Sequence, residues 1–165
     1  MIFEEENHIY KIDFSNAIWA TDQLNKLFHN AKTELSDVDF IAETDNTILF
    51  VEYKNANIPN ASSPSSFSPT DNKKITQIVK KYYDSLIYIY AIGKHKEKKK
   101  KYIYILEYPL GDVITRKLIR NRLQTKLPFL LQEQNSFNYK LIDEVSVLSI
   151  YEWNSIFSDF PLTRV

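Results

Sequence analysis

Apolar residues recur at helical spacing in several segments of the chain, which predicts helices. The three longest segments are residues 15–30, 72–92 and 113–126. Each is associated with a residue able to cap a helix N-terminus, namely Ser15, Asp71 and Asp112. Gly93, directly after the second segment, is typical of a residue that ends a helix in the left-handed conformation. A short helix is also expected over residues 151–157.

Runs of apolar, β-branched and aromatic residues predict strands between these helices. The runs cover residues 34–43, 47–56, 102–108, 137–142 and 145–150. Strands and helices in this order form an α/β fold, with a mixed central β-sheet flanked by helices on both faces. A chain of 165 residues favours one domain, residues 1–165.

Residues 57–72 are rich in Pro, Ser and Asn, which predicts a flexible loop directly after strand 47–56. A loop of this length is unusual inside a compact domain, so it is either functional or disordered. It does not separate two domains, because the segment before it is too small to bury a core alone.

Composition and charge narrow the classes of function. The chain has 21 basic and 21 acidic residues, so its net charge is zero and any anion-binding surface must be local. It has no Cys, which excludes thiolate metal sites, and only 2 Gly, too few for a glycine-rich phosphate loop. We find neither a signal-peptide pattern nor an apolar run long enough to cross a membrane. We therefore expect a cytoplasmic protein without a membrane partner.

Strands 34–43 and 47–56 are expected to form a hairpin whose register decides where its charged side chains lie. If Asp45 and Asn46 form a two-residue turn, the numbers of opposed residues sum to 91. Asp39 then lies opposite Glu52, with Cβ atoms about 4.5–5.5 Å apart. One face of the hairpin becomes almost wholly apolar, and charged side chains gather at the far end of the other face. These side chains are Asp37, Asp39, Glu52 and Lys54.

Two carboxylates that converge at a strand end favour a bound cation. Mg²⁺ (or Mn²⁺) prefers oxygen ligands and often takes only one or two protein carboxylates, together with waters and substrate phosphate oxygens. The carbonyl oxygen of Tyr53, between Glu52 and Lys54, is a further candidate ligand. Lys54 would orient or help to deprotonate a metal-bound water. This equipment suits the hydrolysis of a phosphodiester.

Asp39, twelve intervening residues and then Glu52-Tyr53-Lys54 resemble the motif of the PD-(D/E)xK nuclease superfamily. The segment VDFIAETDNTILFVEYKNA resembles the strand hairpin of its restriction-endonuclease-like and Holliday-junction-resolvase-like branches, although Val38 replaces the usual Pro. The resemblance covers about residues 15–108. It implies an αβββαβ-type core, Asp39 and Glu52 as metal ligands, Lys54 as the catalytic lysine, and DNA as substrate. Such enzymes frequently act as homodimers.

Further candidates come from the same resemblance and from local clusters of charge. Asp22 is the available acid in the first predicted helix, where many members of the superfamily carry one. Gln77 corresponds to the Gln of a Gln-x-x-x-Tyr motif in some members, although Tyr82 follows it by five positions. Basic clusters can bind phosphates. The candidate DNA contacts are Lys73, Lys74, Lys98, Lys99, Lys100, Arg116 and Arg120.

Three functions remain open on the sequence alone. The first is a Mg²⁺-dependent endonuclease-like protein that acts on DNA. The second is a catalytically inactive nucleic-acid-binding or assembly module with the nuclease fold. The third is a structural or partner-binding protein, in which Asp39, Glu52 and Lys54 form an ordinary salt-bridged strand end and the lysine run 94–101 is a solvated turn.

Overall fold

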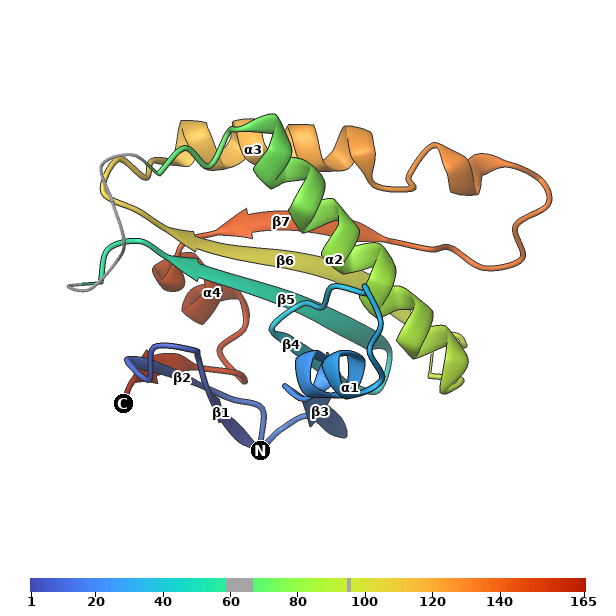
Figure 1. Ribbon diagram of the computed structural model, residues 1–165, viewed down its shortest axis with the longest axis horizontal. Helices are drawn as coiled ribbons and strands as arrows, with labels where there is room; N and C mark the ends of the chain where they lie inside the picture. The colour runs from blue at the N-terminus through green and yellow to red at the C-terminus, as the bar shows by residue number, and fades with distance from the viewer. Residues whose placement is uncertain (59–66, 95) are drawn as a thin grey trace.

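Two β-sheets and four α-helices build a mixed α/β fold in this computed structural model, which describes residues 1–58, 67–94 and 96–165 (Figure 1). The larger sheet has the strand order β3-β4-β5-β6-β7. Its strands are β3 (Trp19–Thr21), β4 (Phe40–Glu43), β5 (Thr47–Asn55), β6 (Lys99–Glu107) and β7 (Glu144–Leu148). Strands β3 to β5 pair antiparallel, whereas β5, β6 and β7 pair parallel, so the predicted mixed sheet is confirmed.

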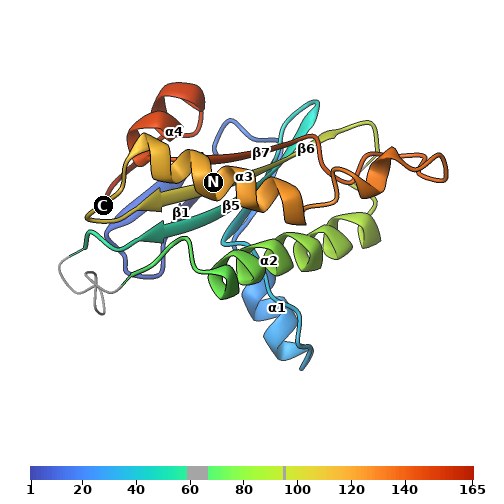
Figure 2. The ribbon, with the colours of Figure 1, turned by 90° about the horizontal axis from the view of Figure 1, so that it is seen from above.

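Helices cover one face of the larger sheet, and a second sheet covers part of the other face (Figures 1 and 2). The first face packs against α1 (Leu24–Asn30), α2 (Asn72–Ala91) and α3 (Val113–Lys126). The opposite face packs against α4 (Ile150–Ile156) and the small antiparallel sheet β1-β2-β8. The small sheet consists of β1 (Ile2–Glu4), β2 (Tyr10–Asp13) and β8 (Leu162–Arg164). The sequence did not predict this second sheet.

Side chains of β5 alternate between the two cores, because successive residues of a strand point to opposite faces. Ile48 and Phe50 are fully buried in the core beneath α2. Leu49 and Val51 lie in the opposite core, with Trp153 of α4. Among the described residues, no helix combines the length and the apolar character needed to cross a membrane.

The capping residues predicted for the helices over 72–92 and 113–126 are confirmed. Asp71 accepts a hydrogen bond from the backbone N–H of Lys73 at 2.8 Å, and Asp112 accepts one from Thr115 at 2.6 Å. Gly93 follows α2 with φ +74°, a conformation that glycine adopts without steric cost. These signals are local, so they locate both helices without knowledge of the tertiary fold.

The helix predicted over residues 15–30 is wrong in its first half. Residues 19–21 form β3, and the backbone N–H of Ile18 donates to the carbonyl of Glu43 at 2.8 Å. Ser15 caps no helix; its backbone N–H donates to Asp13 at 2.8 Å. Helix α1 therefore follows the first of three antiparallel strands, whereas the expected αβββαβ-type order places a helix before them.

Three strand predictions also needed correction. Residues 34–39 are not in a strand, because side chains of α2 hydrogen-bond to this backbone. Asp84 accepts a hydrogen bond from the backbone N–H of Ser36, and Ser85 accepts one from the backbone N–H of Val38. Residues 137–142 form no strand either, and the side chain of Gln132 bonds to the backbone there. Strand β6 begins at Lys99, three residues before the predicted start. Residues 59–66 of the predicted loop 57–72 lie outside the described residues.

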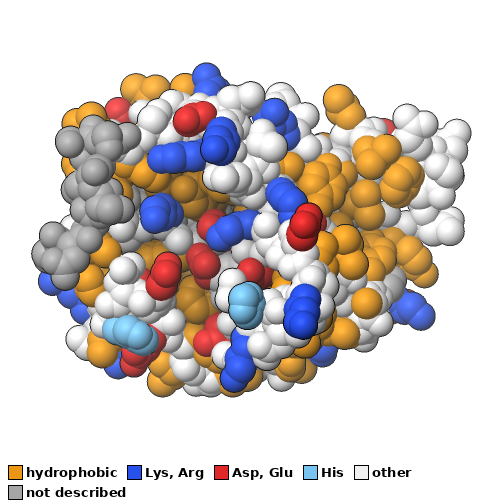
Figure 3. Space-filling model, in the orientation of Figure 1, with side chains coloured by type: hydrophobic (Ala, Val, Ile, Leu, Met, Phe, Trp, Pro, Cys, Tyr) orange, Lys and Arg blue, Asp and Glu red, His pale blue; other side chains and the backbone are white. Residues whose placement is uncertain are grey.

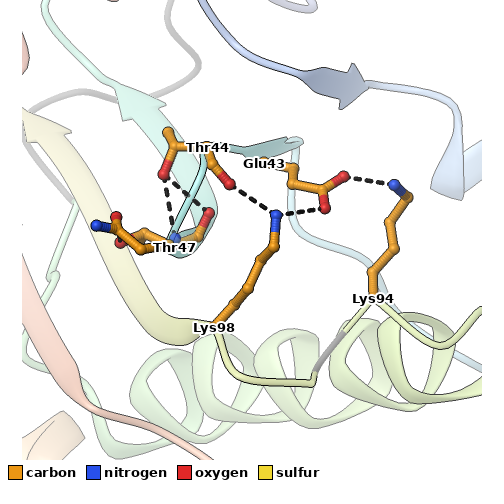
Figure 4. A network of polar contacts seen from close by, with 6 residues as sticks. Glu43, Thr44, Thr47, Lys94 and Lys98 are labelled. Carbon is orange, nitrogen blue, oxygen red and sulfur yellow. Dashed lines mark hydrogen bonds and ion pairs between the residues drawn. The ribbon is translucent and has the colours of Figure 1, made fainter.

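An ion-pair cluster fixes the turn end of the β4–β5 hairpin (Figure 4). The backbone N–H of Thr44 donates to the carbonyl of Thr47 at 2.8 Å, which closes the predicted two-residue turn. Glu43 is only 6% exposed, and both of its carboxylate oxygens are paired, one with Lys94 and the other with Lys98 at 2.7 Å. Lys98 also donates to the Thr44 carbonyl at 2.8 Å. The cluster joins the hairpin to the segment between α2 and β6.

Candidate active site

The predicted register of the β4–β5 hairpin is confirmed. Phe40 pairs with Val51 and Ile41 with Phe50, so the numbers of opposed residues sum to 91. The same register, continued one residue beyond β4, places Asp39 opposite Glu52. Oδ2 of Asp39 accepts a hydrogen bond from the backbone N–H of Tyr53 at 2.7 Å. Both acids therefore lie at one end of the hairpin and on one side of the sheet.

A cavity of about 600 Å³ opens over this end of the hairpin. Its lining comes from four parts of the chain: the β1–β2 turn, the region of α1, the β4–β5 hairpin and α2. The charged residues among the lining are Glu4, Glu5, Glu6, Asp22, Asp37, Asp39, Lys54 and Lys81. Figure 3 shows acidic side chains gathered in a hollow in the middle of this face, with Lys and Arg side chains above it. The cavity is therefore rich in negative charge.

Glu52 is a buried charged group beside this cavity. The residue is 7% exposed, and its Oε1 lies 2.7 Å from Nζ of Lys81 in α2. Its Oε2 is buried and has no hydrogen-bond partner among the described residues. Burial raises the pKa of Glu52 to about 8, and the negative charge of Asp39 adds to this effect. A buried carboxylate oxygen without a partner is costly unless a cation or a proton satisfies it.

The acids near Glu52 also lack enough positively charged partners. Burial raises the pKa of Asp39, and the positive charge of Lys81 opposes this shift only in part. Burial also raises the pKa of Asp37, which accepts a hydrogen bond from the side chain of Asn25 at 3.2 Å. Burial would lower the pKa of Lys81, but Glu52 and Asp39 raise it overall. Three acids thus share one half-buried ammonium group, that of Lys81.

Lys54 projects from β5 two residues after Glu52 and lines the same cavity. Its side chain is exposed, and within the described part of the chain it makes no hydrogen bond or ion pair. An unengaged ammonium group at the mouth of a cavity is available to a bound anion or water. Of the sequence-predicted trio, Asp39 and Lys54 line one cavity and Glu52 is buried beside Asp39.

Lys81 is the residue that the sequence analysis missed. It lies one helical turn after Gln77, on the same side of α2. Gln77 itself is exposed and does not line the cavity, so the structure places Lys81, not Gln77, at the acids. The sequence did contain a signal for Lys81. It borders the apolar stripe of Ile78 and Tyr82, on the helix that covers strand 47–56. A lysine in this position can pair with a buried Glu of the strand. Asp22 does line the cavity.

Lysines 98–100 lie at the opposite end of the sheet from the cavity. Lys99 pairs with Thr47, and Lys54 lies seven residues further along β5, or about 23 Å at the usual rise of a strand. Lys98 is bound to Glu43, and Lys100 is 3% exposed and donates to two backbone carbonyls at 3.0 Å. Of these three lysines, Lys99 has the exposed side chain.

The remaining predicted DNA contacts divide between exposed and engaged side chains. Lys73 is exposed at the start of α2, and Nζ of Lys74 lies 4.0 Å from the centre of the Phe67 ring. Arg116 is 9% exposed, with its Nε 3.1 Å from a carboxylate oxygen of Glu152. The Nε of Arg120 donates to the carbonyl of Val145 at 3.4 Å. Lys73 is thus the freest of this group.

The residues at the cavity fit a hard divalent cation that takes few protein ligands. No cluster of three or more His, Asp or Glu able to hold a metal occurs in the described residues. Asp39 and Glu52 supply two carboxylates, one with an unpaired buried oxygen. The carbonyl of Tyr53 points to the same side as its N–H, toward Asp39, because a strand residue directs both groups to one neighbour. Mg²⁺ commonly completes such a set with water and substrate oxygens.

No family model, curated protein or solved structure matches this chain. The function is therefore inferred from the chemistry of the cavity and from the hairpin motif.

Proposed function

We propose that this chain is a divalent-cation-dependent nuclease-like protein that hydrolyses DNA phosphodiester bonds. The observation that carries the proposal is the position of Asp39, which a 2.7 Å hydrogen bond from the Tyr53 N–H holds beside the buried Glu52. Lys54 lines the same cavity with an exposed ammonium group. A cavity lined by an acid and a lysine, with a second acid buried beside the first, has the components of metal-assisted phosphodiester hydrolysis.

Each residue has a distinct role in this proposal. Asp39 and Glu52 hold the Mg²⁺ or Mn²⁺ ion, with the carbonyl of Tyr53 as a third oxygen. A bound ion of this kind lowers the pKa of a coordinated water and polarises a phosphoryl oxygen. The Lys54 ammonium orients the attacking water and offsets negative charge on the phosphate. The Tyr53–Asp39 hydrogen bond keeps one carboxylate in place before any ion arrives.

Element order adds support for a restriction-endonuclease-like core. Helix α1, the β4–β5 hairpin, α2 and β6 follow one another, and this helix, hairpin, helix, strand order is the one that the resemblance to the PD-(D/E)xK superfamily implies. The position of α1 after β3 departs from it. We include a homodimeric assembly in the proposal, on the same resemblance, and a cytoplasmic location, as expected from the sequence.

An inactive nucleic-acid-binding or assembly module is the second candidate, and one observation favours it. The acids that line the cavity outnumber its basic residues, and Lys81 already occupies one oxygen of Glu52. A cavity of this charge repels DNA phosphates unless cations are bound. The two candidates therefore differ in whether the site binds a divalent ion.

Incubation of the protein with plasmid and branched DNA in Mg²⁺ or Mn²⁺ tests the proposal. Cleavage that needs the ion and disappears in Lys54→Ala supports a nuclease. DNA binding without cleavage, measured by gel shift at low and rising salt, supports the inactive module, because phosphate contacts weaken steeply as salt increases. Absence of both cleavage and binding would contradict any role with nucleic acid.

A further inference from the structure

Lys81 carries the ammonium group that is paired with Glu52 at the candidate site. Its Nζ lies 2.7 Å from Oε1 of Glu52, and its side chain is 31% exposed, against 9% for that of Glu52. We propose that Lys81 is a resident counter-ion, which holds the Glu52 carboxylate in the metal-free protein and is displaced by the divalent cation. This inference rests on the proposed metal-dependent function.

The pairing of Glu52 differs from that of the buried carboxylate at the other end of the hairpin. Glu43 has both oxygens paired, with Lys94 and with Lys98, as expected for a structural ion pair. Glu52 has one oxygen paired and one buried without a partner among the described residues. Because a half-satisfied buried carboxylate is unfavourable, the arrangement at Glu52 leaves room for a second cationic partner.

The Lys81 side chain can move away from the ion pair, whereas Glu52 is held in place by the sheet. Glu52 lies within β5, between β4 and β6, so its backbone is fixed by the sheet. Lys81 projects from α2 on a flexible four-carbon side chain that also lines the cavity, where its ammonium can be hydrated. The released ammonium group stays beside the cavity and is available to an anionic substrate.

Competition between two cations for one carboxylate has a measurable consequence. Lys81 lowers the affinity of the wild-type site for a divalent ion, by occupying an oxygen and by repelling the ion. Lys81→Met removes both effects and keeps a side chain of similar length. We expect Lys81→Met to bind Mn²⁺ at least about tenfold more tightly than the wild type, which corresponds to about 1.4 kcal/mol. A purely structural lysine predicts no gain.

The experiment is a calorimetric titration of Mn²⁺ into the full chain at low salt and about pH 8, because protons compete with the metal for carboxylate ligands more strongly at lower pH. Lys81→Arg keeps the positive charge and should retain the wild-type affinity. The matched control is Lys80→Met, because Lys80 is the adjacent lysine of α2, pairs with Asp84 and does not line the cavity. Thermal unfolding of each variant checks that it is folded.

The outcomes separate this inference from the proposed function. Tighter binding by Lys81→Met, with unchanged binding by Lys80→Met and Lys81→Arg, supports the counter-ion role. Equal or weaker binding by Lys81→Met overturns that role and leaves the metal-dependent function standing. Failure of both the wild type and Lys81→Met to bind Mn²⁺ overturns both.

A second measurement uses the wild-type protein and does not depend on the folding of a variant. If the ion displaces Lys81 from Glu52, Mn²⁺ should increase the reaction of the Lys81 amine with an acylating reagent, as read by peptide mass spectrometry. The reactivity of Lys80 should not change. Unchanged or reduced labelling of Lys81 at saturating Mn²⁺ would contradict the displacement.

Discussion

Oδ2 of Asp39 lies 2.7 Å from the backbone nitrogen of Tyr53 and accepts its hydrogen bond. Backbone pairing between β4 and β5 has ended at Phe40 and Val51, so this side chain extends the ladder by one step. An acid that replaces a backbone carbonyl in this way cannot turn out toward solvent without leaving the Tyr53 N–H unpaired. The same contact holds its carboxylate beside Glu52.

Replacement of Asp39 by Asn keeps an oxygen that can accept the Tyr53 hydrogen bond but removes the negative charge. We therefore expect Asp39→Asn to fold normally and to lose affinity for Mn²⁺ by at least about tenfold, together with DNA cleavage. Calorimetry and a plasmid assay measure the two effects. Asp45→Asn, an exposed position in the hairpin turn, is the matched control. Unchanged Mn²⁺ affinity in Asp39→Asn would exclude Asp39 as a ligand.

Stability in the absence of metal should fall as pH rises, and Glu52 is the cause. Its pKa is about 8 in the folded protein, against an ordinary value of 4.5, so the folded state keeps a proton that the unfolded state has lost. Its stabilising contribution is therefore complete below pH 4.5 and is lost as pH rises through 8.

Replacement of Glu52 by Gln should remove this pH dependence. We expect Glu52→Gln to match the wild type near pH 5 and to be more stable by about 1–3 kcal/mol near pH 8, the usual cost of an unsatisfied buried group. Urea denaturation in EDTA at several pH values measures the difference. Mg²⁺ should stabilise the wild type and not the variant. A constant difference between the two proteins across pH would show that Glu52 titrates normally.

Lys54 is expected to act on the reaction and not on the metal. Because its ammonium group is exposed and unengaged within the described residues, Lys54→Met should leave Mn²⁺ affinity and thermal stability close to wild type. Cleavage should fall by about 10²–10⁴-fold, the range for loss of a proton-transfer group. Lys26→Met, an exposed lysine of α1, serves as the comparison. If Lys54→Met lost Mn²⁺ affinity as well as cleavage, Lys54 would contribute to metal binding and not to the reaction alone.

The two ends of the sheet should differ in their contribution to DNA binding. Lys73 lies at the start of α2, on the helix that brings Lys81 to the cavity, whereas Lys99 lies at the far end of β5 and β6. We expect Lys73→Ala to weaken DNA binding and to reduce the salt slope by about 1, and Lys99→Ala to change neither. Fluorescence anisotropy at several salt concentrations compares them. The reverse result would place the nucleic acid on the lysine run.

The ion-pair cluster around Glu43 should stabilise the fold without touching the cavity. Glu43→Gln leaves Lys94 and Lys98 without their shared counter-charge, and we expect a loss of about 1–3 kcal/mol in the free energy of unfolding. Urea denaturation measures the loss, and Glu97→Gln, an exposed position between the two lysines, is the control. Equal stability of both variants would show that the cluster contributes nothing.

The hairpin register could be derived from sequence because only one register separates the apolar residues from the charged ones. Phe40, Leu49 and Val51 indeed lie in one core, while Ile41 and Phe50 lie in the other. A shift of one residue would exchange the two sets, so the pattern itself specifies the pairing. The prediction that Asp39 and Glu52 meet is a consequence of this rule.

Contacts between distant segments could not be derived in the same way. Strands β1, β2 and β8 have three or four residues each, too few for a recognisable alternation, and their pairing joins opposite ends of the chain. Residues 19–21 satisfied a helical pattern, yet pairing with β4 determined their conformation. The contact of Lys81 with Glu52 depends on how α2 crosses the sheet, which no local pattern encodes.

Pairing of β2 with β8 has a consequence for the order of folding. Tyr10 of β2 pairs with Arg164 of β8, 154 positions later in the sequence. This pairing anchors the β1–β2 turn, which contributes Glu4 to Asn7 to the cavity. Contacts of such long separation form late, after the local hairpin and helices. We expect pulse-labelling hydrogen exchange to protect β5 before β2. A folding molecule would then bring Asp39 and Glu52 together first and add Glu4, Glu5 and Glu6 of the β1–β2 turn to the cavity last.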